Sequence, residues 1–378
     1  MTLSIIPSWC SGLLPVLAFG CLGSLTASAL DWTAGFETGK PPIQSISQIT
    51  FGPEGILFAA DSKSASIFAI ATGDTKPIAK GNALRIEGIN TQIAALLGVN
   101  ADQVLIDDLA VNPISHTAYL AVSRGRGPEA VPVLIRVNQQ NHLEVVALDK
   151  ARFSRADLPD APVDAPPAEG KRGGNPRMET ITDIAFLEDR LLVAGLSNEE
   201  FSSTLRSLPF PFKKAVRGSS VEMYHGAHGR FETRSPIRTF VPFKVGNEPQ
   251  LLAAYTCTPL VQLPLKELLP GAKVKGKTIA ELGNWNRPLD MIVYQKDGKD
   301  FLLIANSARG VMKLSTDKIE AAESIAEHVK DGKTRGLAFE TVKGWTGIDQ
   351  LDRLDQDTAL VLRKGEGSVQ NLESMPLP

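Results

Sequence analysis

Four aspartates at matching places in a repeated pattern could together hold a cation. Each stands at the start of the first of two strand-like segments joined by a turn, and the four are Asp108, Asp183, Asp290 and Asp349. Carboxylates that converge from several parts of a chain suit a hard cation such as Ca²⁺, which takes about six to eight oxygen ligands. In the alternative interpretation, each carboxylate accepts backbone N–H bonds from a neighbouring loop and joins adjacent elements.

Two histidines in the motif HGAHG, His225 and His228, form a His-x-x-His pair that could hold Zn²⁺ or Cu²⁺. The flanking segments VEMY and RFET predict a hairpin, and the two glycines account for its turn without a metal. This register places the pair on the face opposite the aspartates, together with His116 and His142. A structural or adventitious role is therefore expected, with a transition-metal site as the alternative.

Polar residues near the ends of the second strands are candidates for ligand binding. They are Arg124, Asn198, Tyr255, Cys257, Asn306 and Arg309, and Arg287, which shortly precedes Asp290, joins them. The arginines could clamp a substrate carboxylate with paired hydrogen bonds or neutralise the aspartates. Cys257 could act as a nucleophile, but no histidine is expected on its face to activate it, so a buried inert thiol is the alternative.

The elements that must position these residues repeat six times. In the clearest copy, residues 178–201, an acidic turn separates two apolar runs, which is typical of a hairpin with largely buried strands. The other copies are residues 44–70, 105–127, 237–265, 288–314 and 347–372. Each copy has the features of a four-stranded meander that cannot bury both of its faces alone.

The repeat predicts an all-β fold, a six-bladed β-propeller in which neighbouring blades cover one another. Seven blades would result if two units have been merged, and a pair of packed sheets is the alternative architecture. The last copy ends after three strands, so the segment Leu30–Phe36 is predicted to supply its missing outer strand and close the ring.

The first copy, with FGPEGILFAADS followed by IFAI, resembles NHL and SMP-30/gluconolactonase-like six-bladed propellers. The resemblance implies a divalent metal at the mouth of the channel, although Gln48 and Thr239 interrupt the series of aspartates here. It also implies hydrolysis of a lactone or ester, in which a bound cation polarises the carbonyl and Asp183 or Asp290 is the general base.

Long insertions fall on the same predicted face as the aspartates, which marks it as the binding face. The segment INTQIAALLGV places Ile89 and Ile93 on one side of a short helix that ends at Gly98. A Pro/Gly-rich loop, 160–177, could be a lid. The segment FSSTLRSLPFPFKKAVRG is interpreted as an extended loop and DKIEAAESIAEHVK as a second helix.

The first 29 residues are predicted to be a signal peptide cleaved after Ala29, with lipoprotein processing at Cys21 as the alternative. The mature chain, residues 30–378, would then be a single propeller domain without a membrane span. Its location would be periplasmic or secreted, and Cys257 would have no partner for a disulfide. A net charge of −2 gives no reason to expect nucleic-acid binding.

These features predict an exported binding protein that recognises a small polar ligand, or another exported protein, at the mouth of its channel. The alternative is a metal-dependent hydrolase of the SMP-30 type. A divalent cation, Ca²⁺, is the cofactor expected if the aspartates bind metal.

Overall fold

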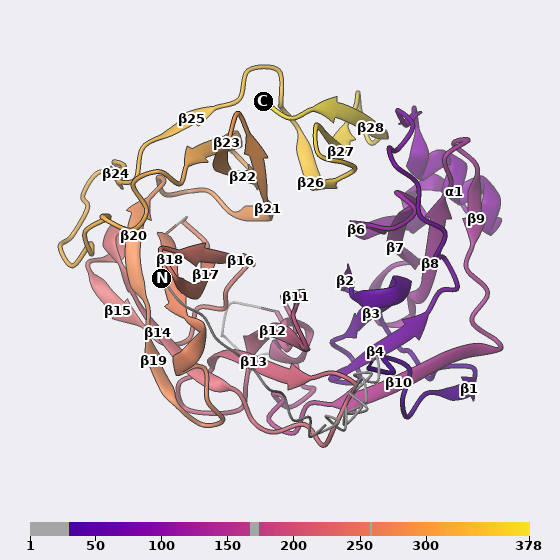
Figure 1. Cartoon of the computed structure of the whole chain (residues 1–378), viewed down its shortest axis with the longest axis horizontal. Helices are drawn as coiled ribbons and strands as arrows, with labels where there is room; N and C mark the ends of the chain where they lie inside the picture. Colours follow the sequence, from indigo (N-terminus) through magenta and orange to yellow (C-terminus); the bar gives the residue numbers. More distant parts are fainter. Residues whose placement is uncertain (1–29, 167–173, 258) are drawn as a thin grey trace, which may run out of the picture. The chain divides into compact units, whose positions relative to one another are not determined.

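Six sheets arranged as blades make up the described part of the chain (Figure 1). The computed structural model describes residues 30–166, 174–257 and 259–378, and Trp32–Pro378 form one compact unit. The predicted signal peptide lies outside the described residues, as do residues 167–173 of the predicted lid.

The blades are numbered here by the chain order of their innermost strands, and their strands are given from the inside outward. Blade 1 contains β2 (Gln48–Phe51), β3 (Ile56–Asp61), β4 (Ser66–Ala71), β10 (Ala151–Asp157) and β1 (Glu37–Gly39). Blade 2 contains β6 (Val104–Val111), β7 (Ala118–Arg124), β8 (Val131–Val137) and β9 (Leu143–Val145). Blade 3 contains β11 (Asp183–Leu187), β12 (Arg190–Leu196), β13 (Ser203–Pro209), β14 (Ser219–His225) and β15 (Arg230–Glu232), with β19 (Lys273–Lys275) parallel to β14.

Blade 4 contains β16 (Thr239–Val245), β17 (Glu248–Ala254), β18 (Pro259–Pro264), β20 (Lys277–Glu281) and β24 (Arg335–Gly336). Blade 5 contains β21 (Pro288–Lys296), β22 (Lys299–Asn306), β23 (Gly310–Ser315) and β25 (Phe339–Thr341). Blade 6 contains β26 (Ile348–Arg353), β27 (Thr358–Lys364), β28 (Gln370–Pro376) and β5 (Arg85–Ile86). Helix α1 is Ile89–Leu97, and short 3₁₀ turns include η4 (Pro176–Glu179) and η5 (Gly226–His228).

The order of the blades around the ring differs from their order in the chain. The innermost strand of blade 1, β2, contacts β6 of blade 2 and β11 of blade 3, while β26 of blade 6 contacts β6 and β21. The ring therefore runs 2, 1, 3, 4, 5, 6 and back to 2 (Figure 1). The two orders differ because strand β10 follows blade 2 in the chain yet pairs with β4 of blade 1. Blade 2 is thus inserted between the third and fourth strands of blade 1.

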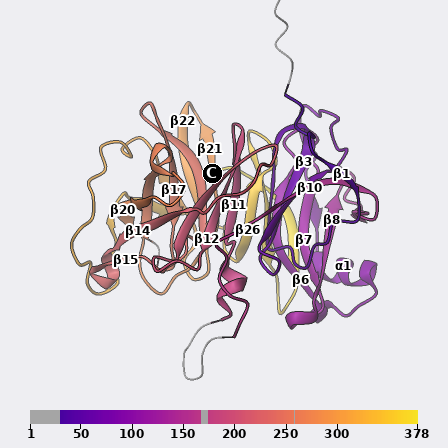
Figure 2. The same ribbon diagram turned by 90° about the horizontal axis from the view of Figure 1, so that it is seen from below.

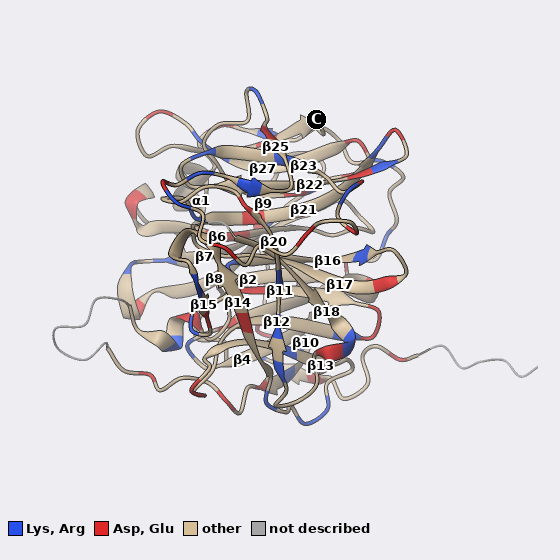
Figure 3. Ribbon diagram, turned by 90° about the vertical axis from the view of Figure 1, so that its left-hand side faces the viewer, with Lys and Arg blue, Asp and Glu red and all other residues tan. Residues whose placement is uncertain are grey.

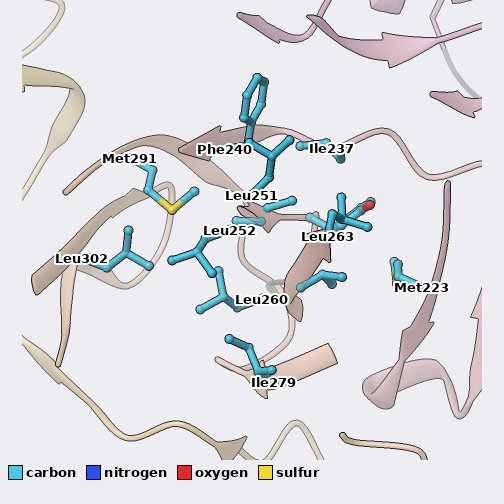
Figure 4. Packing of buried hydrophobic residues seen from close by; sticks show 14 of the residues in the cluster. Met223, Ile237, Phe240, Leu251, Leu252, Leu260, Leu263, Ile279, Met291 and Leu302 are labelled. Atoms are coloured by element: carbon cyan, nitrogen blue, oxygen red, sulfur yellow. The ribbon is translucent and has the colours of Figure 1, made fainter. Parts of the chain in front are cut away.

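Strands with continuous apolar runs lie where both faces of a blade are covered. All six residues of β3 are buried, as a strand packed between two neighbouring blades requires. The largest buried cluster draws on blades 3, 4 and 5, and its close packing is seen in Figure 4, which labels Leu251, Leu252, Leu260, Ile279, Met291 and Leu302 among others. The predicted six-bladed propeller is confirmed.

The ring does not close as the sequence predicts. Strand β5 is the outer strand of blade 6, because Ile86 pairs with Leu372 and Arg85 with Glu373. The prediction that Leu30–Phe36 fills this place is wrong. Instead, Trp32 and Phe36 pack against Phe210, and the centroid of the Trp32 ring lies 6.1 Å from that of the stacked Phe210 ring. Strand β5 has two residues, too few to show a strand pattern in the sequence. The apolar segment Leu30–Phe36 is therefore the more prominent candidate when only the sequence is known.

Of three predicted insertions, one has the expected structure and two do not. The helix predicted at Ile89–Gly98 is confirmed as α1, whose chain reversal at Gly98 has φ of +66°. Residues 317–330, predicted to be helical, are not in a helix; Ile319, Ile325 and Val329 are buried one by one against blades 3 and 4. The segment interpreted as an extended loop in the third copy contains β13, so VEMY belongs to the fourth strand of its blade and not the third.

A buried ion pair holds the start of the 160–177 loop against blade 3. The Arg206 side chain on β13 is fully buried, and its Nε donates to Asp160 Oδ1 at 2.7 Å. Its other nitrogens donate to Thr180 O at 3.0 Å and Leu196 O at 2.9 Å. Asp160 Oδ2 accepts the Gly218 N–H at 3.0 Å. One guanidinium thus ties together the two ends of the loop and two strands of the blade.

The surface carries both signs of charge. Figure 3 shows Lys and Arg interspersed with Asp and Glu along the ribbon on the side in view. Within the described ranges, no helix is both long and apolar enough to cross a membrane.

Candidate functional site

The inner strands of the six blades line a cavity of about 430 Å³ along the channel. Four carboxylates on its wall come from four blades: Asp108 on β6, Asp183 on β11, Asp290 on β21 and Asp352 on β26. Among the described residues, no lysine or arginine forms an ion pair with any of them. Arg353, next to Asp352, also lines the cavity, and its charge partly offsets the rise in the pKa of Asp352.

Each of these carboxylates also joins two blades. In every case Oδ2 accepts a backbone N–H from the inner strand of the next blade, at 2.7 to 2.8 Å. The pairs are Asp108 with Ile49, Asp183 with Phe240, Asp290 with Leu351 and Asp352 with Val111. The interpretation of the aspartates as contacts between blades therefore describes what they do in the fold. Each carboxylate still has lone pairs left for a ligand in the channel.

The predicted position of Asp349 is wrong. Strand β26 has a bulge between Ile348 and Gln350, so Asp349 is the extra residue and does not line the cavity. Its Oδ1 accepts a hydrogen bond from Lys364 Nζ at 2.7 Å. Asp352, three residues further along β26, lines the cavity instead. The same kind of bulge precedes Asp108 on β6 and Asp290 on β21, so the repeat position that matches these two acids is Gln350, and Asp352 lies two residues beyond it.

Burial in the channel wall raises the pKa of all four carboxyls. The pKa of Asp183 rises to about 7 and that of Asp352 to about 6, in both cases chiefly through loss of hydration. Burial, followed by the charge of Asp290, raises the pKa of Asp108 well above its usual range. Burial does the same for the pKa of Asp290, with the charges of Asp183 and Asp352 adding to the effect. A cation in the channel would reduce the electrostatic repulsion between the ionised carboxylates.

The channel carboxylates are not arranged as direct ligands of one metal ion. In the described part of the chain, one group of three or more acidic, histidine or cysteine side chains brings its ligand atoms within 4.8 Å of one another, and it contains none of these aspartates. Acids that stand apart suit a polyatomic cation or a hydrated ion better than a bare ion.

The seven predicted ligand-binding residues do not converge on the channel. None of Arg124, Asn198, Tyr255, Cys257, Arg287, Asn306 and Arg309 lines the cavity. Tyr255 and Asn306 are buried, at 1% and 5% exposure. Arg309 donates to Asn284 O at 3.0 Å, and the Cys257 N–H donates to Asn286 O at 2.7 Å. Arg124 and Asn306 end strands β7 and β22, and the others lie in loops on the same end of blades 3 to 5.

Within the described ranges, the one group of converging ligand atoms is formed by His225, His228 and Cys257. Since β14 is the fourth strand of blade 3, its end lies on the same face as the loop after β17 that carries Cys257. The prediction that the His pair lies on the opposite face, away from Cys257, is wrong. His116 and His142 do lie in turns between first and second, and third and fourth, strands of blade 2, on the opposite face. Figure 2 shows α1 and the β15 hairpin toward one end of the blades.

Glu232 on β15 binds both histidines. Its Oε2 lies 3.1 Å from His225 Nδ1, and its Oε1 lies 2.6 Å from His228 Nδ1. Ser235 Oγ donates to Oε2 at 2.6 Å. Although burial opposes it, these hydrogen bonds from His225, Ser235 and His228 hold the pKa of Glu232 well below its usual range. The two imidazole rings lie 3.8 Å apart between centroids.

A second acid positions the turn that carries the histidines. Glu281 on β20, 1% exposed, accepts the Gly226 N–H through Oε1, and a Cβ on Gly226 would lie 2.7 Å from that oxygen. Burial raises the pKa of Glu281 to about 7. Neither Glu232 nor Glu281 was predicted from the sequence, although Glu232 stands four residues after His228 in a hairpin, a spacing that places an acid beside the turn.

No protein-family model and no curated protein matches the chain. Similar solved structures include a putative oxidoreductase (glucose dehydrogenase) from Thermus thermophilus, with 13% identity, TM-score 0.34 and coverage of 90% of this chain and 100% of that one. Another is the PQQ-bound aldose sugar dehydrogenase of Streptomyces coelicolor, with 11% identity, TM-score 0.30, and 89% and 96% coverage. A third is the apo-form aldose sugar dehydrogenase of Escherichia coli, with 12% identity, TM-score 0.32, and 90% and 99% coverage.

These similarities are too remote to bear on activity. The protein is a six-bladed β-propeller. Of the predicted resemblance, this architecture is confirmed, while membership of the NHL or SMP-30 group stays a prediction.

Proposed function

We propose that this protein is an exported binding protein whose channel holds a small polar ligand that carries positive charge. The observation that carries the proposal is the set of four channel carboxylates, Asp108, Asp183, Asp290 and Asp352. They outnumber the one basic side chain on the described cavity wall, Arg353, and form no ion pair with a described lysine or arginine. Their separation favours a polyatomic cation or a hydrated Ca²⁺ ion over direct coordination by all four. Export and a periplasmic or secreted location rest on the leader sequence of residues 1–29.

The test is a thermal-shift and calorimetric titration with Ca²⁺, Mg²⁺ and a short polyamine at pH 8. A ligand that binds the folded state at about a hundredfold excess over Kd stabilises it by about 2.7 kcal/mol. Asp290→Asn should abolish the shift. Asp349→Asn, on the same inner strand as Asp352 but bound to Lys364 outside the cavity, is the matched control and should keep it. Absence of binding by all three probes would count against a cation-binding channel.

A second candidate function is a hydrolase of the SMP-30 type acting on a lactone or ester. The specific observation in its favour is Asp183, whose pKa of about 7 suits a general acid or base near neutral pH. Turnover of a sugar lactone or an aryl ester that disappears in Asp183→Asn and Asp290→Asn would support it. Binding of a cationic ligand without turnover would favour the binding protein.

The channel should make stability depend on pH. The folded Asp183 and Asp352 carboxyls bind protons more tightly than in the unfolded chain, since their pKa values are raised to about 7 and about 6. Their contribution to stability is therefore complete below about pH 4 and is lost as the pH rises through about 6 and 7. Between about pH 5 and 8 without divalent ions, we expect the wild-type melting temperature to fall more than that of Asp183→Asn. Equal slopes would mean that Asp183 does not titrate in this range.

A further inference from the structure

We propose that His225, His228 and Cys257 form a binding site for a transition-metal ion of borderline softness, Zn²⁺ or Cu²⁺, on the loop face of blades 3 and 4. This site is separate from the channel and does not depend on the ligand proposed there. A nitrogen from each imidazole and the Cys257 Sγ lie within 4.8 Å of one another. Two imidazoles and a thiolate are a donor set that zinc and copper share and that Ca²⁺ and Mg²⁺ avoid.

The hydrogen bonds to Glu232 decide which ring nitrogens are available. A carboxylate only accepts, so the Nδ1 atoms at 3.1 Å and 2.6 Å from its oxygens must both carry hydrogen. This leaves Nε2 of each neutral ring as the nitrogen with a free lone pair. A carboxylate behind the histidine is the arrangement by which proteins orient metal-binding imidazoles and raise their basicity. Here one carboxylate serves both rings.

The buried histidine provides an independent observation. His225 is 2% exposed, and its Nε2 has no hydrogen-bond partner among the described residues. A buried nitrogen with an unused lone pair is costly, because it has lost its water and gained nothing in exchange. A metal ion bound at that nitrogen removes the deficit. A purely structural His–Glu contact would account for Nδ1 but would leave Nε2 unexplained.

The backbone brings the cysteine to the histidines. Cys257 has φ of +63°, a conformation that non-glycine residues seldom adopt, and it is held there by its N–H bond to Asn286 O at 2.7 Å. Strained residues of this kind gather at functional sites, where the surrounding structure maintains them. On the other side, Glu281 and the Val329 N–H bind the Gly226 peptide and fix the histidine turn. Both halves of the site are therefore positioned by neighbouring blades.

The separations suit an ion that draws its ligands together. Ligand atoms around tetrahedral zinc lie about 3.5 Å apart, given Zn–N of about 2.0 Å and Zn–S of about 2.3 Å. Closing from the observed limit of 4.8 Å requires small side-chain rotations, for which there is room because His228 is 44% exposed and Cys257 is half-buried. Three protein ligands on an exposed edge leave a coordination position for water or substrate, on the face where the Trp285 ring is 87% exposed.

The direct test is a metal titration of the full chain after treatment with a chelator. Isothermal calorimetry with Zn²⁺ and elemental analysis should give about one ion per chain at neutral pH. Co²⁺, a spectroscopic substitute for Zn²⁺, should give a thiolate-to-cobalt absorption band, and Cu²⁺ a thiolate-to-copper band. These bands report Cys257 in the coordination sphere and do not depend on any activity.

Variants separate a built site from casual binding by surface histidines. Cys257→Ser and His228→Ala should each weaken Zn²⁺ at least about tenfold, and Cys257→Ser should remove the cobalt band. Glu232→Gln should weaken Zn²⁺ binding about 10- to 100-fold, because the amide has one accepting oxygen and can orient only one of the two imidazoles. His142→Ala, which removes a histidine on the opposite face, is the control and should bind Zn²⁺ as the wild type does.

Each outcome decides the proposal. Wild-type protein that binds no stoichiometric Zn²⁺ or Cu²⁺, or a Cys257→Ser variant that binds Zn²⁺ with unchanged affinity, would overturn it. His225 is buried, and its replacement could prevent folding. The variants are therefore made at the exposed His228, at Cys257 and at Glu232. Melting curves recorded in EDTA establish that these variants remain folded.

Discussion

Replacing Arg206 by methionine is expected to destabilise the folded protein by about 3–5 kcal/mol, because Asp160 would remain buried without a counter-charge. Both side chains are almost completely removed from water, and the guanidinium also satisfies two backbone carbonyls. Denaturation in guanidinium chloride at pH 7 measures the loss. The same substitution at Arg190, whose ion pair with Asp189 is exposed, is the matched control and should cost less than about 1 kcal/mol.

The reason for this large effect can itself be tested. In the double variant Arg206→Met with Asp160→Asn, the uncompensated charge is gone, so part of the lost stability should return. If the double variant were as unstable as the sum of the two single variants, the ion pair would not be the source of the effect. The loss would then arise from packing around the Arg206 side chain.

Phe58→Ala is expected to cost a further large amount, about 3–5 kcal/mol. Phe58 on β3 is fully buried, and its ring contacts Phe186, Phe210 and Phe212 at centroid distances of 5.4, 4.8 and 5.9 Å. These three rings come from blade 3, so the cluster joins blade 1 to its neighbour in the ring. The substitution leaves a cavity at that joint.

Thermal and chemical denaturation measure the effect, and Phe231→Ala is the control. Phe231 is 43% exposed at the β15 hairpin and should cost less than about 1 kcal/mol. Similar losses for the two variants would show that the joint between blades 1 and 3 has little effect on stability. A loss confined to Phe58 would identify this joint as a main support of the ring.

The repeated hairpins could be predicted from the sequence because each strand's apolar run is local and is buried on both faces. Three of the four channel acids were found in this way. The fourth, Asp352, was missed because it does not stand at the repeat position of Asp108 and Asp290, which Gln350 occupies in β26. Matching of repeat positions finds acids at equivalent places, and it misses an acid that reaches the channel from another place on its strand.

The histidines were assigned to the wrong face for a related reason. The segment STLRSLP alternates too weakly to stand out as a strand, and prolines follow it, so it was interpreted as a loop. Adding β13 to blade 3 turns VEMYH from a third strand into a fourth and moves its end to the other face. The meeting of Cys257 with His225 and His228 depends on contact between two blades, which no single-sequence period encodes.

The insertion of blade 2 within blade 1 has a consequence for a nascent chain that emerges from its N-terminus. Until residue 157 has been made, β4 has a bare edge because its outer neighbour β10 is missing, and β1 waits as well because it pairs with β10. Blade 2 can be completed before the blade that precedes it. The ring then waits for β28 to reach β5, a pairing of Leu372 with Ile86 across most of the chain. Pairings between such distant residues slow folding, and waiting edges invite association with other chains. This architecture thus makes β5, which is synthesised before any strand of blade 2, wait for β28, the last strand of the chain.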